Sequence, residues 1–168
     1  MISIGIDNSY TGAIAAVEFL EAQNPRVISC ELMPTISVGK SIAIDEDKVW
    51  QRLIEIRELY EDVIIGFEIG QKNPLFGCKG NFSNGFSYGV IRTVVRLSGM
   101  RHIEINPKTW QKEIFRDIRG LEMSTKSASI EYCRRQFPEQ SLLPTPRCKK
   151  PHDGMADSLC LAVYTAKE

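Results

Sequence analysis

Apolar and polar residues alternate at the start of the chain in the pattern of a β-strand. Ile2, Ile4 and Ile6 are separated by serine and glycine, which is the period of two that a strand requires. The polar stretch that follows is rich in turn formers, and residues 12–20 return as a second apolar run. The pattern predicts two antiparallel strands joined by a turn, with one carboxylate, Asp7, where the first strand ends.

Further along, continuous apolar runs alternate with stretches in which apolar residues recur at helical spacing. The runs 26–33, 63–67 and 101–105 predict strands, and residues 35–43 and 70–85 are predicted connections. Helices are predicted from Asp45 or Asp47 to Tyr60, from Asn84 to about Ser98, from Pro107 to about Phe115, from Ser124 or Thr125 to Phe137, and from His152 or Asp153 to about Thr165. Three strands followed by alternating helices and strands predict an α/β fold, in which parallel strands extend an antiparallel meander.

Composition narrows the class of protein. A single domain over residues 1–168 is the simplest expectation for this length, and 43% apolar with 25% charged residues is ordinary for a globular chain. Neither an apolar run of about 18–20 residues nor a signal-peptide pattern occurs, so we expect no membrane partner. The five scattered cysteines form no CxxC pair, which predicts reduced thiols in a cytoplasmic or organellar compartment.

The net charge of zero conceals an asymmetry along the chain. Residues 1–68 carry 5 Lys or Arg against 12 Asp or Glu, and residues 69–150 carry 15 against 6. Residues 151–168 carry 1 against 3. A basic middle between acidic ends is typical of a polyanion-binding surface beside a carboxylate cluster, although a solvated helical face gives the same balance.

Four carboxylates fall where a sheet and a helix can bring them together. Asp7 and Glu68 each follow an apolar strand, and Asp153 and Asp157 are one turn apart on the last helix. Clustered acids repel one another and need cations, and oxygen donors of this kind are the ligands that Mg²⁺ or Mn²⁺ prefers. Two such ions activate water and stabilise the leaving oxygen in phosphodiester cleavage. We therefore expect a metal site, with no small-molecule cofactor.

The fourth position of this set has two candidates. His152 precedes Asp153 and has the chemistry to orient water, act as a general base or bind the second ion, or it is simply an exposed residue at a helix start. Asp153 is also a candidate for the N-cap of the last helix, a role that does not exclude metal binding.

Three segments resemble the motifs of the RuvC-type Holliday-junction resolvases in the RNase H-like superfamily. They are GIDNSYTGAIAAVE, IIGFE and HDGMADSLCLAVY, in the family's order and over the whole chain length. The HDG before ADSLCLA is closer to the chloroplast and phage branches, which allows a phage-encoded source. The resemblance implies an RNase H-like fold with a mixed five-stranded sheet flanked by helices, and a homodimer that makes paired nicks in four-way DNA junctions.

The resemblance also implies roles for individual residues. Asp7 matches the aspartate of the first strand, Glu68 the glutamate of the fourth strand, and Asp157 the aspartate of the last helix. The family has an acid or a histidine three residues before that aspartate, where this chain has Gly154, so the fourth ligand falls on His152 or Asp153. The helix after Glu68 would supply much of the dimer interface.

The same resemblance places the 70–85 connection and the basic middle of the chain beside the DNA. Phe76 and Phe82 are suited to stacking on bases or wedging into an opened junction, or they fold back onto a small core of the loop. Trp110 is predicted to belong to the core. The candidate nucleic-acid contacts are Lys72, Phe76, Lys79, Asn81, Phe82, Asn84, Lys108, Lys112, Arg116, Arg119, Lys126, Arg147, Lys149 and Lys150.

Three other functions fit parts of the sequence. A kinase-like ATPase half-domain shares the aspartate and glycine of the first hairpin, but the chain is too short for the two lobes that enclose ATP. A nucleic-acid-binding or dimerisation module with a decayed nuclease fold would not require intact acids at every strand end. An RNase H-like nuclease of other specificity, for RNA–DNA hybrids or other branched DNA, is the strongest alternative.

Overall fold

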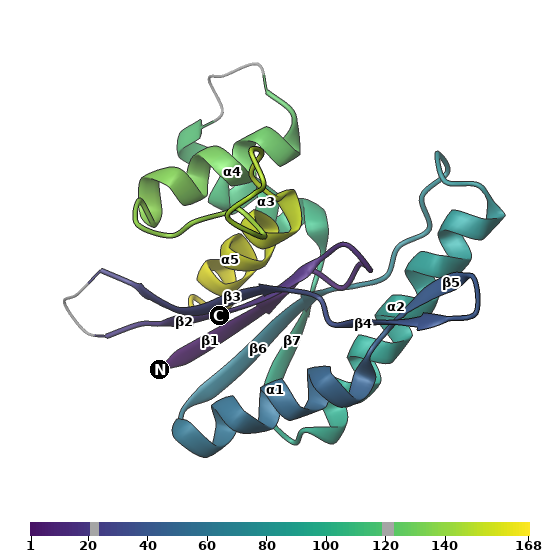
Figure 1. Cartoon of the computed structure of the whole chain (residues 1–168). Helices are drawn as coiled ribbons and strands as arrows, with labels where there is room; N and C mark the ends of the chain where they lie inside the picture. Colours follow the sequence, from purple (N-terminus) through teal and green to yellow (C-terminus); the bar gives the residue numbers. More distant parts are fainter. Residues whose placement is uncertain (21–23, 119–122) are drawn as a thin grey trace.

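The computed structural model describes residues 1–20, 24–118 and 123–168, and its centre is a mixed five-stranded sheet (Figure 1). The strands stand in the order β3-β2-β1-β6-β7. β1 is antiparallel to β2 and parallel to β6, which is itself parallel to β7. Their bounds are β1 Ile2–Ile6, β2 Ala13–Glu18, β3 Arg26–Leu32, β6 Val63–Glu68 and β7 Arg101–Ile105.

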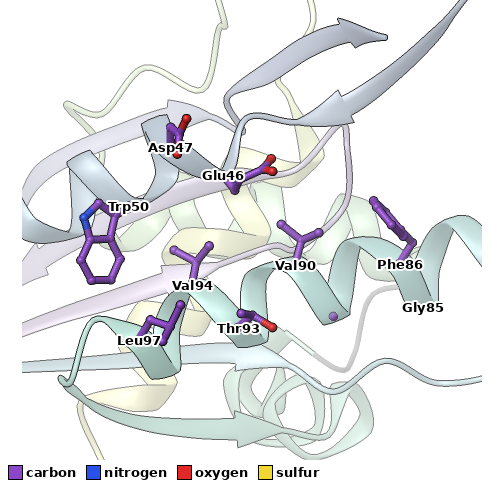
Figure 2. A pocket seen from close by; sticks show the side chains of 10 residues that line it. Glu46, Asp47, Trp50, Gly85, Phe86, Val90, Thr93, Val94 and Leu97 are labelled. Atoms are coloured by element: carbon purple, nitrogen blue, oxygen red, sulfur yellow. The ribbon is translucent and has the colours of Figure 1, made fainter.

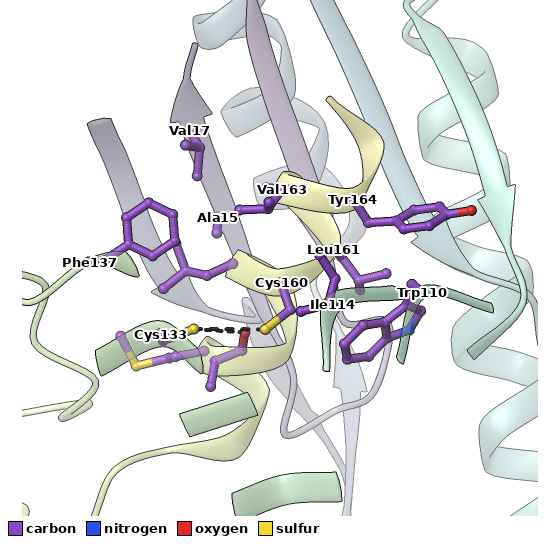
Figure 3. Packing of buried hydrophobic residues seen from close by; sticks show 14 of the residues in the cluster. Ala15, Val17, Trp110, Ile114, Cys133, Phe137, Cys160, Leu161, Val163 and Tyr164 are labelled. Carbon is purple, nitrogen blue, oxygen red and sulfur yellow. Dashed lines mark hydrogen bonds between the residues drawn. The ribbon is translucent and has the colours of Figure 1, made fainter. Parts of the chain in front are cut away.

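Helices cover both faces of this sheet (Figure 1). α1 (Glu46–Leu59) and α2 (Cys78–Leu97) pack on one face, where Ile2, Ile4 and Ile6 point. The other face carries α3 (Pro107–Ile114), α4 (Thr125–Gln136) and α5 (Asp153–Thr165), with a short 3₁₀ turn at Arg116–Ile118. Figure 3 shows this second core, in which Trp110 and Ile114 lie beside α5. Each face therefore has its own hydrophobic core.

α5 lies directly on the sheet because the strand residues beneath it are small. Ser3 Oγ donates to the Ala162 carbonyl over 2.7 Å. A Cβ atom at Gly5 would overlap the backbone of α5 at Ser158, and one at Gly66 would overlap the Thr165 hydroxyl. Packing of this closeness fixes the height of α5 above β1 and β6, and hence the position of any side chain on its first turns.

Two predicted connections contain regular structure instead. Residues 35–43, expected to be a connection, form most of a hairpin of β4 (Thr35–Val38) and β5 (Ser41–Ile44), which turns through Gly39 at φ 61°. The 70–85 connection ends early, because α2 begins at Cys78 and not near Asn84. The glycines in this stretch are poor helix formers and hid the first turns of the helix from the sequence pattern.

The other predicted elements are present with ends shifted by a few residues at most. Asp45 caps α1 through the Lys48 amide, Pro107 opens α3, and Ser124 caps α4. The five cysteines, all within the described residues, are free. In the part of the chain that the structure describes, no helix is long and apolar enough to cross a membrane.

Candidate active site

Strand alternation puts Asp7 and Glu68 side by side beneath α5. Ile6 pairs with Phe67 in the parallel register of β1 and β6, and both side chains point into the α1–α2 core. Asp7 and Glu68 are the next residues on each strand, so they point to the opposite face. The sequence prediction that these two acids end neighbouring strands is confirmed.

The third acid, Asp157, reaches the same place from α5. Gly154, three residues earlier on the same face of α5, lies against the first acid, because a Cβ there would be 3.0 Å from Asp7 Oδ2. The charges of Asp7, Glu68 and Asp153 also raise the pKa of Asp157. Ser129 of α4 hydrogen-bonds to Asp157 Oδ1 from the other side. We call Asp7, Glu68, Asp153 and Asp157 the acid cluster.

Burial dominates the electrostatics of three members of the cluster. Loss of hydration raises the pKa of Asp7, although the Ser9 amide hydrogen-bonds to Asp7 Oδ1 over 3.2 Å and opposes the shift. Loss of hydration also raises the pKa of Glu68 and of Asp157, in each case to about 7. A hydrogen bond opposes each of these shifts and neighbouring acids add to them. At neutral pH the cluster is thus only partly ionised.

Asp153 differs from the other three because it has a cationic partner. Lys126, in the first turn of α4, forms an ion pair with Asp153, and this contact lowers the pKa of the aspartate. The suggestion that Asp153 caps α5 is wrong, since the cap position is His152 and Asp153 is the first helical residue. Lys126, a predicted phosphate contact, is instead held at the edge of the acid cluster.

His152 contributes an unsatisfied polar atom next to the cluster. Its Nδ1 is buried and finds no hydrogen-bond partner among the residues that the structure describes. Its backbone is fixed, because the His152 amide donates to the Leu142 carbonyl over 2.8 Å. A buried nitrogen without a partner costs free energy unless a ligand or water supplies one, so His152 remains a candidate for the fourth position.

Steric crowding explains why residue 154 is a glycine. A Cβ there would lie 2.8 Å from the Thr11 carbonyl oxygen, 2.9 Å from Gly12 Cα and 3.0 Å from Asp7 Oδ2. The turn after β1 therefore leaves no room for a side chain, and an acid or a histidine at this position would not fit. The neighbouring positions, His152 and Asp153, are the ones with space.

These donors fit a divalent cation in type, as partly ionised carboxylates and one buried imidazole nitrogen. Across residues 1–20, 24–118 and 123–168, however, no group of three or more His, Cys, Asp or Glu side chains is arranged to hold a metal ion. Glu68 is turned to Trp110, Asp157 to Ser129 and Asp153 to Lys126. The predicted metal ligands lie near one another, but their side chains do not point to a common position. The metal site therefore stays a prediction.

Two residues that the sequence did not assign to the site touch the acids. Trp110 is in the core, as predicted, with 1% of its surface exposed, and its indole Nε1 donates to Glu68 Oε1 over 2.7 Å. Ser129 is fully buried and bonds to Asp157. Neither a tryptophan nor a serine on a helix is by itself typical of a catalytic motif. The sequence therefore contained no specific signal for these two contacts.

A groove of about 510 Å³ begins at Glu68 and runs along the predicted DNA-binding loop. Lys72, Phe76, Asn84 and Lys108 line it, so four of the candidate contacts lie together beside an acid of the cluster. Asn81 does not face it as a free contact: its amide donates to the Asn73 and Phe76 carbonyls and holds the loop together. Asn84 likewise donates to the Gln71 carbonyl.

The remaining candidates within the described residues are exposed and do not line this groove. Phe82 is 74% exposed and stacks on Phe86 with 6.2 Å between ring centroids, so the alternative in which Phe82 folds back onto a core of the loop is wrong. Arg119 lies outside the described residues. The exposed basic candidates away from the groove are Lys79, Lys112, Arg116, Arg147, Lys149 and Lys150.

On the opposite side of the sheet, α1 and α2 enclose an apolar groove of about 640 Å³ (Figure 2). Phe86, Val90, Val94 and Leu97 of α2 line it, facing Trp50 of α1. Phe86 is 50% and Leu97 69% exposed. The exposed apolar side of α2 is where the sequence predicted a dimer interface.

Solved structures of Thermus thermophilus RuvC are similar to this chain. RuvC in complex with a Holliday junction substrate matches with a TM-score of 0.68 and 16% identity, over 99% of this chain and 93% of that one. A second RuvC structure matches with a TM-score of 0.63 and 18% identity, over the same shares of the two chains. No protein-family model and no curated protein sequence matches significantly. This chain has the RuvC fold.

The RuvC fold confirms the predicted fold class, a mixed five-stranded sheet with flanking helices. The match spans 99% of this chain and 93% of the RuvC chain. At this level of identity the likeness is one of fold. The closer relation to the chloroplast and phage branches stays a prediction.

Proposed function

We propose that this protein is a metal-dependent endonuclease that cuts four-way DNA junctions. The observation that carries the proposal is the acid cluster: the half-buried Asp7 and Glu68 stand at the ends of neighbouring strands beneath α5, which carries Asp157. The fold is that of RuvC, which has been solved in complex with a Holliday junction substrate. Burying several acids is costly unless a cation binds them, so the cluster has a function beyond stability.

The chain's own residues have distinct tasks in this proposal. Asp7, Glu68 and Asp157, with His152 or Asp153, hold Mg²⁺ or Mn²⁺, and this number of ligands suits two ions. Bound ions of this kind activate water and stabilise the leaving oxygen in phosphodiester cleavage. If Asp153 is the fourth ligand, His152 Nδ1 is free to orient a water molecule. Lys126 is within reach of the acids and balances charge until the phosphate arrives.

The groove at Glu68 is the proposed path of the DNA strand. Lys72 and Lys108 line the groove and supply phosphate contacts that position the backbone beside the acids. Phe76, 49% exposed, is placed to stack on a base. Paired nicks need two active sites, so we propose that the exposed apolar side of α2 binds a second copy of the chain.

One assay tests the proposal. The protein is incubated with a synthetic four-way junction, a linear duplex and an RNA–DNA hybrid, each with Mg²⁺, Mn²⁺ or EDTA. We expect paired nicks in the junction alone, and only with metal. Equal cleavage of the hybrid or the duplex would assign another nuclease specificity, and junction binding without any cleavage would favour a non-catalytic binding module.

A further inference from the structure

Two neutral side chains hold one oxygen each of two acids in the cluster. Trp110 of α3 donates its indole N–H to Glu68 Oε1 over 2.7 Å, and Ser129 of α4 hydrogen-bonds to Asp157 Oδ1. A carboxylate has two oxygens, so each acid keeps the other oxygen for a further partner. The two donors come from helices that carry none of the four acids.

Both donors are fixed by packing that is independent of the acids. Trp110 is buried, and its ring meets Phe115 edge-on with 5.3 Å between centroids and 71° between planes. Ser129 is fully buried, and its Oγ also lies 3.1 Å from the Thr125 carbonyl oxygen. Each donor is therefore anchored by contacts other than its hydrogen bond to the acid.

The chemistry of the donors suits acids that bind metal. The indole N–H donates a hydrogen bond but carries no charge, so it orients Glu68 and leaves the negative charge of the carboxylate intact. A lysine in its place would cancel that charge. A serine hydroxyl is likewise uncharged, so Ser129 holds Asp157 Oδ1 without adding a charge beside the cluster.

We propose that Trp110 and Ser129 are positioning residues that orient Glu68 and Asp157 for binding a divalent cation. This inference rests on the proposed function of the cluster as a metal site. Partners of this kind typically change metal affinity or activity by roughly 10- to 100-fold when they are removed.

The first test is Trp110→Phe, which keeps an aromatic ring and removes the N–H. Its control, Ile114→Val, also removes buried volume from α3 but no hydrogen bond. We measure the Mn²⁺ concentration that half-maximally raises the melting temperature, the nicking rate against Mn²⁺, and junction affinity in EDTA. Trp110→Phe should raise both Mn²⁺ midpoints about 10- to 100-fold, with junction affinity unchanged, and Ile114→Val should leave the midpoints as in the wild type.

The second test uses Ser129→Ala and Ser129→Thr, which remove and keep the hydroxyl. Ser87→Ala is the control, because Ser87 is also buried in a helix and bonds only to backbone carbonyls of α2. The alanine variant at 129 should raise the Mn²⁺ midpoints, and the threonine variant should restore them. This pair also decides the matter if Trp110→Phe does not fold.

The outcomes separate the two proposals. Wild-type Mn²⁺ midpoints in Trp110→Phe and Ser129→Ala, or equal losses in Ser129→Ala and Ser129→Thr, would overturn the positioning roles while leaving the nuclease intact. If the wild type binds Mn²⁺ but never cuts a junction, the proposed function fails, and the thermal midpoints still test the positioning residues.

Discussion

The two faces of the sheet are covered in opposite ways, although the same strands supply both. On the α1–α2 side, β1 presents Ile2, Ile4 and Ile6 to an apolar core, and the outer surface of α2 remains apolar and exposed. On the α5 side the same strand presents Ser3 and Gly5, and then Asp7. On the α1–α2 face β1 packs through large apolar side chains, whereas on the α5 face its small residues let the helix approach closely.

The difference shows how a fold holds buried acids. Large side chains on the α5 side would lift the helix, and Asp157 would no longer reach the strand ends. Small residues under α5 let the helix approach the sheet closely, and apolar side chains of α3, α4 and α5 form a core around it, so both faces stabilise the fold. The α5 face carries the costly site in addition.

The largest expected effect comes from neutralising the acids of the α5 face. Asp7→Asn and Glu68→Gln should each lower the nicking rate at least about 10³-fold, because each removes a charge that the cations require. Junction affinity should be unchanged or higher, since the acids repel phosphate. Rates and affinities are measured separately, by single-turnover nicking and by binding in EDTA. Nicking at the wild-type rate by either variant would refute the site.

Glycine substitutions test the difference in packing directly. Gly5→Ala should lower the free energy of unfolding by about 3 kcal/mol, because its Cβ meets the backbone of α5. Gly89→Ala on α2 makes the same chemical change where nothing lies within 4 Å, and should add roughly 0.5–1 kcal/mol. Urea unfolding of both variants measures the pair. Similar changes at the two positions would contradict the close packing of α5.

The exposed apolar side of α2 is tested by a charge. Phe86→Asp should weaken self-association at least about 100-fold, because a carboxylate would be buried at the centre of the proposed interface. Sedimentation velocity over a range of concentrations measures this. Leu59→Asp, on α1 and outside the groove, is an exposed apolar control. If the wild-type protein is monomeric at all concentrations, the proposal that α2 forms a dimer interface is refuted.

The pH dependence of stability follows from the raised pKa values on the α5 face. Glu68 and Asp157 keep their protons to about pH 7 in the folded chain, against ordinary values of 4.5 and 3.8. The folded state therefore binds more protons between about pH 4 and 7, and metal-free stability should fall as pH rises through that window. Mg²⁺ binds the ionised form and should stabilise more at pH 8 than at pH 5. Thermal melts with EDTA or Mg²⁺ measure both trends, and Glu68→Gln should flatten the metal-free curve.

The smallest expected effect concerns the basic linker before α5. Replacing Lys149 and Lys150 by glutamine removes two positive charges, and each one that binds a phosphate should contribute up to about one to the slope of log junction affinity against log salt. The slope of the double variant should therefore be shallower than that of the wild type. Fluorescence anisotropy at several salt concentrations measures the slope. An unchanged slope would indicate that the linker does not contact the DNA and would favour the groove at Glu68 as its binding site.

The sequence predicted the fold well because its strongest signals are periodic. Alternation in 2–6 and the continuous run 63–67 fixed two adjacent strands, and the acids that end them followed from position alone. The start of α2 was missed because the residues around Gly80 and Gly85 lack helical preference, and a side chain, Asn81, stabilises the preceding loop. Local propensity does not report such tertiary support.

The site was predicted less completely than the fold. The acids stand in recognisable motifs, whereas the contacts of Trp110 and Ser129 depend on how α3 and α4 lie against α5. The pairing of Lys126 with Asp153 joins residues far apart in sequence, and no periodic signal connects them. Orientation of a side chain within a site is a property of the packing around it, which a single sequence does not display.

The close approach of glycines at both ends of α5 has a consequence for motion. Gly154 lies against the turn after β1, and Gly66 lies against Thr165 at the far end of the helix. Sliding or tilting of α5 would drive these contacts into overlap, so the helix resists both movements. The backbone that carries Asp153 and Asp157 therefore stays in place when an ion arrives, and any adjustment is a side-chain movement rather than a shift of the helix.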